Sequence, residues 1–200
     1  VLTHGHLDHV GGIGAFTDVY LGEADFAMTR NLNAEQLRGF ADEIGRNGGY
    51  QAYEYDLNKI QPFEMPTFHA LHEGDVFELG NRRVECIEVA GHTPGGICFL
   101  DEATKILFSG DACNQNLLVL GCSVRKTLEG LYHLKTYETR YERSYSGHIG
   151  FGGMQGYFSQ PETILDDCIK TAPREGMLYA EHGTARLSYY PDCLEKDPER

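Results

Sequence analysis

Residues 4–9 read HGHLDH, so three histidines and an aspartate fall within six positions, directly after a possible strand end. Side chains two residues apart share a face of an extended backbone, so we expect His4 and His6 to reach one metal ion. Asp8 and His9 follow where the chain turns, and we expect them to serve a second ion nearby. The cluster therefore predicts a metal centre at one end of a sheet. The alternative interpretation is a His-rich surface turn.

Three later segments place one ligand-type side chain in a turn of small residues directly after a β segment. AGHTPGG contains His92, ILFSGDA contains Asp111 and YSGHIG contains His148. Glycine in such a turn lets the backbone approach a bound group closely. One such turn alone is more often structural than functional. Four ligand-bearing turns in order, each after a strand, favour a shared site.

The remaining sequence indicates a mixed α/β chain with a sheet-rich middle. Helices are expected over 24–30 and 34–44, with Asn33 as the N-cap of the second. Short strands are expected between His69 and Gly110 at VFEL, RRVECIEVA, ICFL and KILFSG, and later at RSYSG, MLYAEH and ARLSYY. The segment 46–66 is rich in glycine, proline and tyrosine, which is typical of a long loop or lid.

Two further helices follow from the spacing of apolar residues. In SVRKTLEGLYHLK the residues predicted to share one helix face are Val124, Leu128, Leu131 and Tyr132. Ahead of PETILDDCIKTA, Ser159 and Glu162 match a capping box.

Composition narrows the class of partner. A formal charge of −13 over 200 residues disfavours nucleic acid, because binding to a phosphate backbone depends on clustered Lys and Arg. No apolar run reaches the roughly 18 residues that cross a bilayer, so no membrane partner is expected. The six cysteines lack a C-x-x-C pair and are interpreted as reduced, mostly buried thiols. The cytoplasm is the default location, although a secretion signal could have been removed ahead of Val1.

The motifs THGHLDH, GHTPGG, FSGD and SGH, in this order, resemble the metallo-β-lactamase superfamily of binuclear metallohydrolases, from residue 1 to about residue 150. The resemblance implies an α/β fold, the four-layer αββα sandwich, with metals in a cleft between its two sheets. It implies that one metal is held by His4, His6 and His92, that the other is held by Asp8, His9 and His148, and that Asp111 bridges both.

The ligand types suit two Zn(II) ions, and Fe or Mn would also be compatible with them. Two divalent ions that share a water lower its pKa toward about 7, so a bridging hydroxide becomes available to attack a carbonyl or phosphoryl centre. By this resemblance Asp8 and Asp111 are the catalytic carboxylates, and Asp8 also orients the nucleophile.

Comparison with branches of the superfamily narrows the chemistry. The β-lactamases typically lack an aspartate at the position of Asp111 and often carry cysteine there, so penicillin hydrolysis is disfavoured. Cys113 is interpreted as a packed thiol. Flavoprotein oxygen reductases carry glutamate where His6 stands, so oxygen reduction is disfavoured. Acyl-homoserine lactonases place a tyrosine shortly after the bridging aspartate, whereas this chain has Asn114 there. Hydroxyacylglutathione hydrolases match all seven ligands, but no counterpart of their basic C-terminal extension is evident.

The sequence therefore predicts a metal-dependent hydrolase of a small-molecule ester, thioester or lactone. The alternatives are a non-catalytic binding scaffold of the same fold and a phosphodiesterase of the same superfamily. Residues 1–200 are expected to form one domain that lacks its first N-terminal strands, which would leave an unpaired sheet edge and apolar surface.

The remaining candidates are given mainly structural interpretations. His182 competes with His148 for the last metal position, and the usual separation from Asp111 favours His148. The histidines outside the motifs (His69, His72 and His133) are expected to be structural or solvated. Tyrosines at 50, 53 and 55 could line the pocket or simply pack the loop. Surface positions are expected for Lys59, Arg82 and Arg83.

Overall fold

Strand β5 (Ile97–Asp101) is buried along its whole length, which places it at the centre of the molecule. Side chains alternate between the two faces of a strand. Ile97 and Phe99 therefore join one apolar cluster, and Cys98 and Leu100 join another on the opposite face. The computed structural model describes residues 1–47, 56–119, 121–148, 155–160, 162–171, 179–182 and 185–189.

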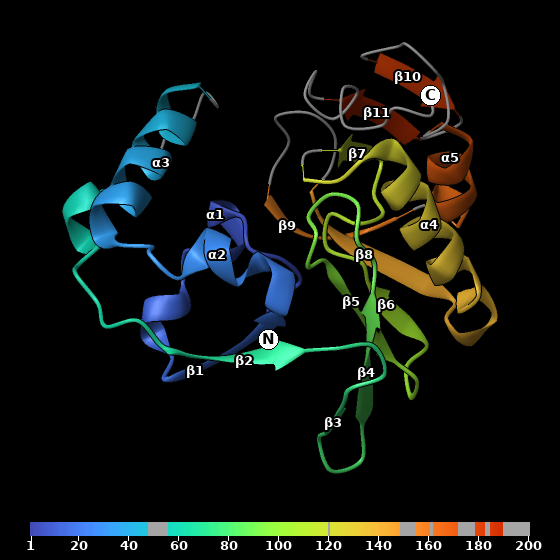
Figure 1. Ribbon diagram of the computed structural model, residues 1–200, viewed down its shortest axis with the longest axis horizontal. Helices are drawn as coiled ribbons and strands as arrows, with labels where there is room; N and C mark the ends of the chain where they lie inside the picture. The colour runs from blue at the N-terminus through green and yellow to red at the C-terminus, as the bar shows by residue number, and fades with distance from the viewer. Residues whose placement is uncertain are drawn as a thin grey trace.

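The central sheet has six strands in the order β3-β4-β5-β6-β8-β9. The other strands are β3 (Val76–Glu78), β4 (Arg83–Glu88), β6 (Ile106–Phe108), β8 (Arg143–His148) and β9 (Gln155–Ser159). Neighbouring strands are antiparallel except for β6 and β8, which pair in parallel. Helices α4 (Val124–Lys135) and α5 (Ile164–Thr171) cover one face of this sheet (Figure 1). Leu131 and Ile164 pack there against the sheet residues Leu100 and Leu107.

A smaller parallel sheet lies on the other side, formed by β1 (Asp18–Gly22) and β2 (Thr67–Leu71). Its helices are α1 (Leu7–Val10), α2 (Phe26–Thr29) and α3 (Ala34–Asn47), with short 3-10 turns η1 (Ile13–Ala15), η2 (Glu23–Asp25) and η4 (Leu57–Lys59). A third apolar cluster, which includes Val10, Val19 and Leu37, joins these helices to β1.

The layers therefore run helix, two-stranded sheet, six-stranded sheet, helix, which is the αββα order expected from the sequence (Figure 1). A further sheet, in the order β10-β11-β7, joins β7 (Asn116–Val119), which precedes α4, to β10 (Tyr179–His182) and β11 (Ala185–Tyr189), which follow α5. The 3-10 turn η5 (Glu138–Arg140) follows α4. Among the described residues, no helix combines the length and apolarity that a membrane crossing needs.

The predicted start of helix α3 is confirmed in detail. The Asn33 Oδ1 atom accepts hydrogen bonds from the backbone N–H groups of Glu35 and Gln36, at 3.0 and 3.1 Å. The Gln36 side chain accepts in return from the Asn33 N–H. This reciprocal pair satisfies donors that would otherwise lack partners at the first turn. The helix continues to Asn47, three residues beyond the predicted end.

One expectation about the later helices is wrong, and the apolar face of α4 is only partly buried. Tyr132 is 57% exposed, and Leu134 is buried in its place, because adjacent helix residues point about 100° apart and Tyr132 lies at the rim of the Val124–Leu131 stripe. Helix α5 begins at Ile164, so the Ser159–Glu162 box does not cap it. Ser159 instead pairs with Tyr145 in the β8–β9 ladder. The prediction of one domain without its first strands stays a prediction.

Candidate metal centre

The four motif turns meet at one end of the two sheets. Residues 1–3 run between them, since the Leu2 N–H donates to the Tyr20 carbonyl of β1 and the Thr3 carbonyl accepts from the Ile97 N–H of β5. The chain then turns into α1, whose first turn holds Asp8 and His9. The other three predicted ligands lie between β4 and β5 (His92), after β6 (Asp111) and at the end of β8 (His148).

His4, His6 and His92 form one group, called here the buried triad, and their ligand atoms lie within 4.8 Å of one another. The His6 Nδ1 and His92 Nε2 atoms are 2.9 Å apart. The His92 Nδ1 atom lies 2.8 Å from the carbonyl oxygen of Leu118. Donation of the Nδ1 proton to that carbonyl leaves the Nε2 lone pair facing the other two rings, as a metal ligand requires.

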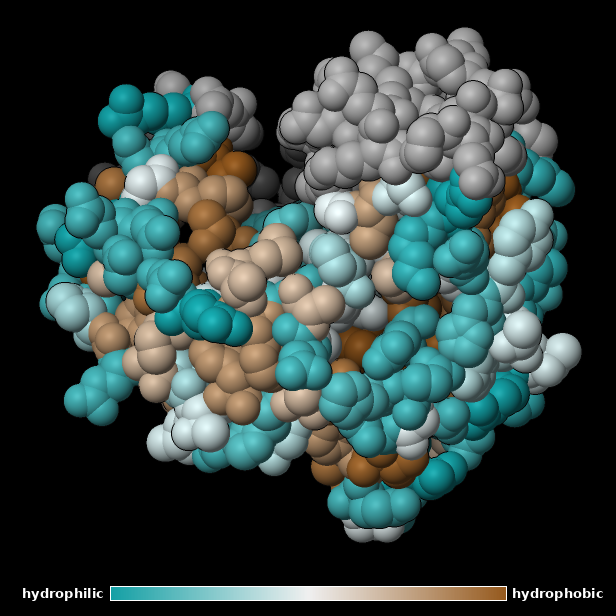
Figure 2. Space-filling model, in the orientation of Figure 1, coloured by the Kyte–Doolittle hydropathy of each residue, from teal (hydrophilic) through white to brown (hydrophobic). Residues whose placement is uncertain are grey.

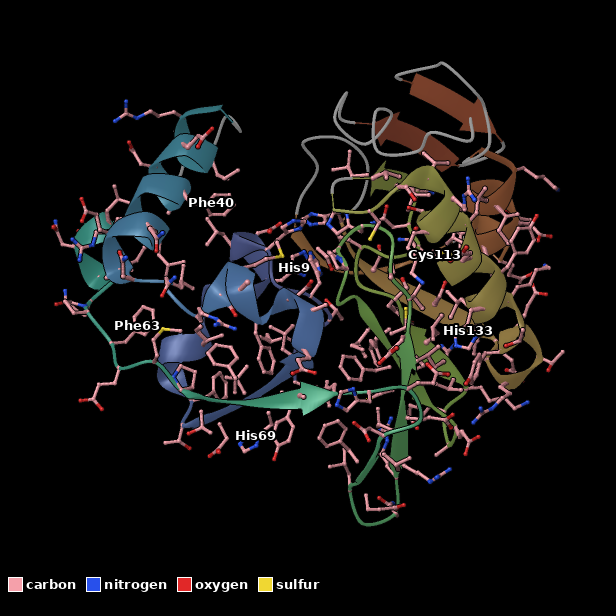
Figure 3. All side chains as sticks on the ribbon, in the orientation of Figure 1. His9, Phe40, Phe63, His69, Cys113 and His133 are labelled. Carbon is pink, nitrogen blue, oxygen red and sulfur yellow. The ribbon has the colours of Figure 1, made fainter. Side chains whose placement is uncertain are left out.

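Asp8, His9 and His148 form a second group, called here the open triad because its side chains are partly exposed. The Nε2 atoms of His9 and His148 are 3.1 Å apart. The His148 Nε2 atom also lies 3.1 Å from the Asp8 carboxylate. In Figure 3, His9 lies at the centre of the molecule, between the N-terminal helices and the six-stranded sheet.

Asp111 lies between the two triads. Its Oδ2 atom is 3.1 Å from His148 Nε2 and 3.6 Å from the Nε2 atoms of both His9 and His92. The turn that presents it depends on Gly110, whose φ of +52° is a left-handed conformation that favours glycine. A Cβ at Gly110 would also lie 2.7 Å from the Thr3 side chain.

Burial dominates the protonation of the buried triad. It lowers the pKa of His4 well below its ordinary value, and nearby His9 and His92 lower it further. Burial, followed by His92, lowers the pKa of His6 to about 4. The pKa of His92 is lowered by burial, which outweighs the opposing charge of Asp111. These rings are therefore neutral at pH 7 and have lone pairs available for a cation.

In the open triad and at Asp111, hydrogen bonds set the direction in which the pKa values shift. Contacts with Asp111 and Asp8 raise the pKa of His148 to about 10. Burial alone would raise the pKa of Asp111, but hydrogen bonds from His148 and His9 reverse this and lower it. The pKa of Asp8 is lowered in the same way, chiefly by His148. Both carboxylates are therefore ionised, and a divalent ion bound here would displace the His148 proton.

The donor set fits divalent metal ions on observations within the site. The His4 Nε2 and Asp111 Oδ1 atoms are buried and have no hydrogen-bond partner among the described residues. A buried polar atom without a partner costs about 1–3 kcal/mol, and coordination of a metal ion by these two atoms would offset that cost. Imidazole nitrogens combined with carboxylate oxygens are typical of zinc sites. Their assignment as ligands remains a proposal.

Other candidates lie away from this cluster. Cys113 is buried, with its Sγ atom 4.0 Å from that of Cys168, as expected of a packed thiol. His69 and His133 contact Asp18 and Glu73 on the surface and are labelled far from His9 in Figure 3. His72 lies beside Glu88. The three tyrosines at 50, 53 and 55, and the side chain of His182, lie outside the described residues.

An apolar cavity of about 570 Å³ opens beside the open triad. Asp8, His9 and His148 lie on its wall, and so do Phe99 and Phe108 from the six-stranded sheet. Leu79, another lining residue, is 60% exposed. Figure 2 shows hydrophobic surface in this region, beside strand β3 at the bottom of the view.

Two supporting contacts were not anticipated from the sequence. One is the Leu118 carbonyl that orients His92. The other is Gln160, whose side chain donates to Ser146 Oγ at 2.7 Å, while Ser146 Oγ donates to the His148 carbonyl at 2.9 Å. Neither Leu118 nor Gln160 lies in a recognisable motif, because only the sheet order brings them to the ligands.

The chain is similar in sequence to several known proteins. Residues 1–120 match the family model of the metallo-beta-lactamase superfamily. The acyl-coenzyme A thioesterase MBLAC2 of Homo sapiens is 35% identical over 123 residues, which are 60% of this chain and 42% of that protein. A hydroxyacylglutathione hydrolase of Ruegeria pomeroyi is 32% identical over 121 residues, 60% of this chain and 34% of that protein. The matched region thus spans less than half the length of these relatives.

Among solved structures, a metallo-beta-lactamase from Pontibacter korlensis superposes with a TM-score of 0.56 at 15% identity, covering 87% of this chain and 68% of the other. At that identity the likeness speaks for the fold alone. The family match extends over more than half of the chain and includes the first three motif turns. This chain belongs to the metallo-beta-lactamase superfamily, and its named relatives are hydrolases.

Proposed function

We propose that this protein is a binuclear metal-dependent hydrolase of a small ester, thioester or lactone. The observation that carries the proposal is the convergence of seven ligand-type side chains into two triads that share Asp111. The metals proposed are two Zn(II) ions, one in each triad, with Fe or Mn as alternatives. A cytoplasmic location remains a prediction.

The substrate class rests on the relatives. One is named an acyl-coenzyme A thioesterase and another a hydroxyacylglutathione hydrolase. The substrates in both names contain a thioester bond, and they differ in the thiol that is released. A thioester carbonyl is therefore the first reacting group to test on this chain.

Each part of the proposed site would have a distinct role in hydrolysis. Metal ions held in the two triads would lower the pKa of a bound water and polarise the carbonyl oxygen. The buried triad holds its rings neutral and fixed, with His92 anchored to Leu118. Asp111 contacts both triads and would keep them at a constant separation. Asp8 lies on the cavity wall, where its ionised carboxylate can accept a hydrogen bond from the attacking water and orient it.

A binding scaffold that performs no chemistry is the competing interpretation. The unpartnered His4 Nε2 and Asp111 Oδ1 atoms argue against it, since burying them confers no benefit on a scaffold. A phosphodiesterase would use the same ligands. It is disfavoured by the relatives, which are named acyl-coenzyme A thioesterase and hydroxyacylglutathione hydrolase.

The test is a substrate panel assayed with metal-loaded and chelator-treated protein. It contains an acyl-coenzyme A, a hydroxyacylglutathione, an aryl ester, a lactone and a phosphodiester. We expect turnover of at least one thioester, its loss on chelation and its recovery on adding Zn(II). Turnover of the phosphodiester alone would favour the second enzyme class. Chelator-insensitive turnover, or none with any substrate, would contradict the proposal.

A further inference from the structure

Asp25 is fully buried at the junction of η2 and α2, close beneath the metal-binding turns. It occupies the N-cap position of α2, where an aspartate usually accepts hydrogen bonds from its own helix. Here its side chain makes no such bond. Among the described residues, no salt bridge reaches it either. A buried carboxylate is costly unless hydrogen bonds compensate it, so its partners define what it does.

Those partners are the backbone N–H groups of two turns far apart in the sequence. The Gly5 N–H donates to Asp25 Oδ2 at 2.9 Å, and the Gly95 N–H donates to Oδ1 at 2.8 Å. Gly5 separates His4 from His6, and Gly95 follows His92 by three residues. One carboxylate therefore joins the two turns that carry the whole buried triad. Both side-chain oxygens of Asp25 thus accept a hydrogen bond from a ligand-bearing turn.

The glycines explain why the turns can approach so closely. A Cβ at Gly95 would lie 2.7 Å from the Asp25 backbone nitrogen and 2.8 Å from its Cγ. A Cβ at Gly5 would lie 3.2 Å from the Asp25 Cβ. The first distance leaves no room for a side chain, and the second is tight. Gly5 and Gly95, two conspicuous residues of the HGH and HTPGG motifs, therefore pack directly on Asp25.

We propose that Asp25 is a positioning residue that clamps the HGH and HTPGG turns together, so that the three imidazoles of the buried triad converge before a metal ion binds. The inference rests on the proposed metal centre. Ligands that are already in place lose less conformational freedom on binding, and outer partners of this kind influence metal affinity by about 10–100-fold. Asp25 touches neither substrate nor metal in this scheme.

The test is Asp25→Asn, which keeps the size of the side chain but replaces one acceptor by an NH₂ group facing a backbone N–H. Metal-free protein is titrated with Co(II), with the visible absorption of the bound ion and its elemental stoichiometry as readouts. We expect one of the two binding steps to weaken by about 10–100-fold and the other to stay within about threefold.

Asp101→Asn is the matched control. Asp101 is also buried, accepts from the Ala103 N–H and Thr104 Oγ1 and pairs with Arg82, at the end of β5 away from the ligand turns. This variant is expected to lower the melting temperature without changing either Co(II) affinity. If reduced stability alone weakened metal binding, both variants would lose Co(II) affinity. If Asp25 positions the ligands, only Asp25→Asn loses Co(II) affinity.

The outcomes separate the two proposals. If the unmodified protein binds no Co(II) at the triads, the proposed function fails before Asp25 is tested. If it binds two ions and Asp25→Asn binds them with the same affinities and spectrum, the clamp is overturned. Should Asp25→Asn fail to fold, Gly5→Ala decides, since its Cβ presses on Asp25 by only a few tenths of an ångström. Unchanged Co(II) affinity in folded Gly5→Ala would also overturn the clamp.

Discussion

The two triads are built from the same residue types but are held in different ways. The buried triad is held from outside, by the Leu118 carbonyl behind His92 and by Asp25 beneath the turns. Its His4 Nε2 atom has no partner among the described residues. The open triad is held from within, because His148 bonds to the carboxylates of Asp8 and Asp111. Each triad contains one close pair of ring nitrogens, His6–His92 and His9–His148. Only in the open triad must a cation also replace contacts between a histidine and two carboxylates.

This difference predicts unequal affinity. A ligand set whose geometry is fixed by its surroundings binds with little rearrangement. A set whose members satisfy one another must break those hydrogen bonds first. We therefore expect the buried triad to hold its ion more tightly than the open triad.

The largest expected effect is that of Asp111→Asn, because Asp111 contacts both triads. Loss of one carboxylate oxygen and of its charge should weaken both binding steps and reduce turnover by more than about 100-fold, the upper end for outer partners of a metal. Elemental analysis and kcat report this directly. Asp18→Asn, at an exposed carboxylate on β1, is the control. Two tightly held metals in Asp111→Asn would show that this residue does not bridge them.

A second pair of variants separates the triads. His92→Ala removes a proposed ligand of the buried triad, and His148→Ala removes a proposed ligand of the open triad. Each should reduce the stoichiometry from two ions per chain to about one, with the tighter ion lost in His92→Ala and the weaker one in His148→Ala. Dialysis against graded chelator measures which ion remains. Equal loss of both ions in each variant would mean that the triads do not bind independently.

A third variant tests the tight packing behind the open triad. A Cβ at Gly147 would lie 2.7 Å from His9 Cε1 and 3.2 Å from Asp111 Oδ1. Gly147→Ala should therefore destabilise the protein by about 1–3 kcal/mol and displace His9. Gly39→Ala is the control, because nothing lies within 4 Å of its added Cβ in α3, and it should stabilise the helix by up to about 1 kcal/mol. Denaturant unfolding compares them, and similar changes in both would contradict the prediction.

The smallest effect is expected far from the metals. The hydrogen bond from Arg140 lowers the pKa of Glu85 below its ordinary value of 4.5. A lowered carboxyl pKa contributes stability that is present above the ordinary value and is lost as the pH falls through the folded one. Arg140→Gln should therefore cost about 1 kcal/mol at pH 7 and less near pH 3, because the pair is partly solvent-screened. Melting curves test this, and metal content should stay unchanged. A pH-independent difference would contradict it.

The sequence predicted features that lie in local motifs, but it did not predict contacts between distant parts of the chain. The convergence of the proposed ligands was predictable, because each lies in a local pattern that can be interpreted from a few residues, such as HGHLDH or HTPGG. The layer order followed from the resemblance of those motifs. Asp25 was not predictable, since in GEADFAM it resembles an ordinary helix start. Its role arises only where η2 meets two turns from distant parts of the chain. The exposed Tyr132 shows the same limit, because a helix stripe identifies a face but not its rim.

Anomalous diffraction from crystals of the zinc-loaded protein tests the central claim most directly. The account predicts two zinc peaks, one at the buried triad and one at the open triad, with Asp111 reaching both. A single peak, or zinc bound away from these seven side chains, would contradict it.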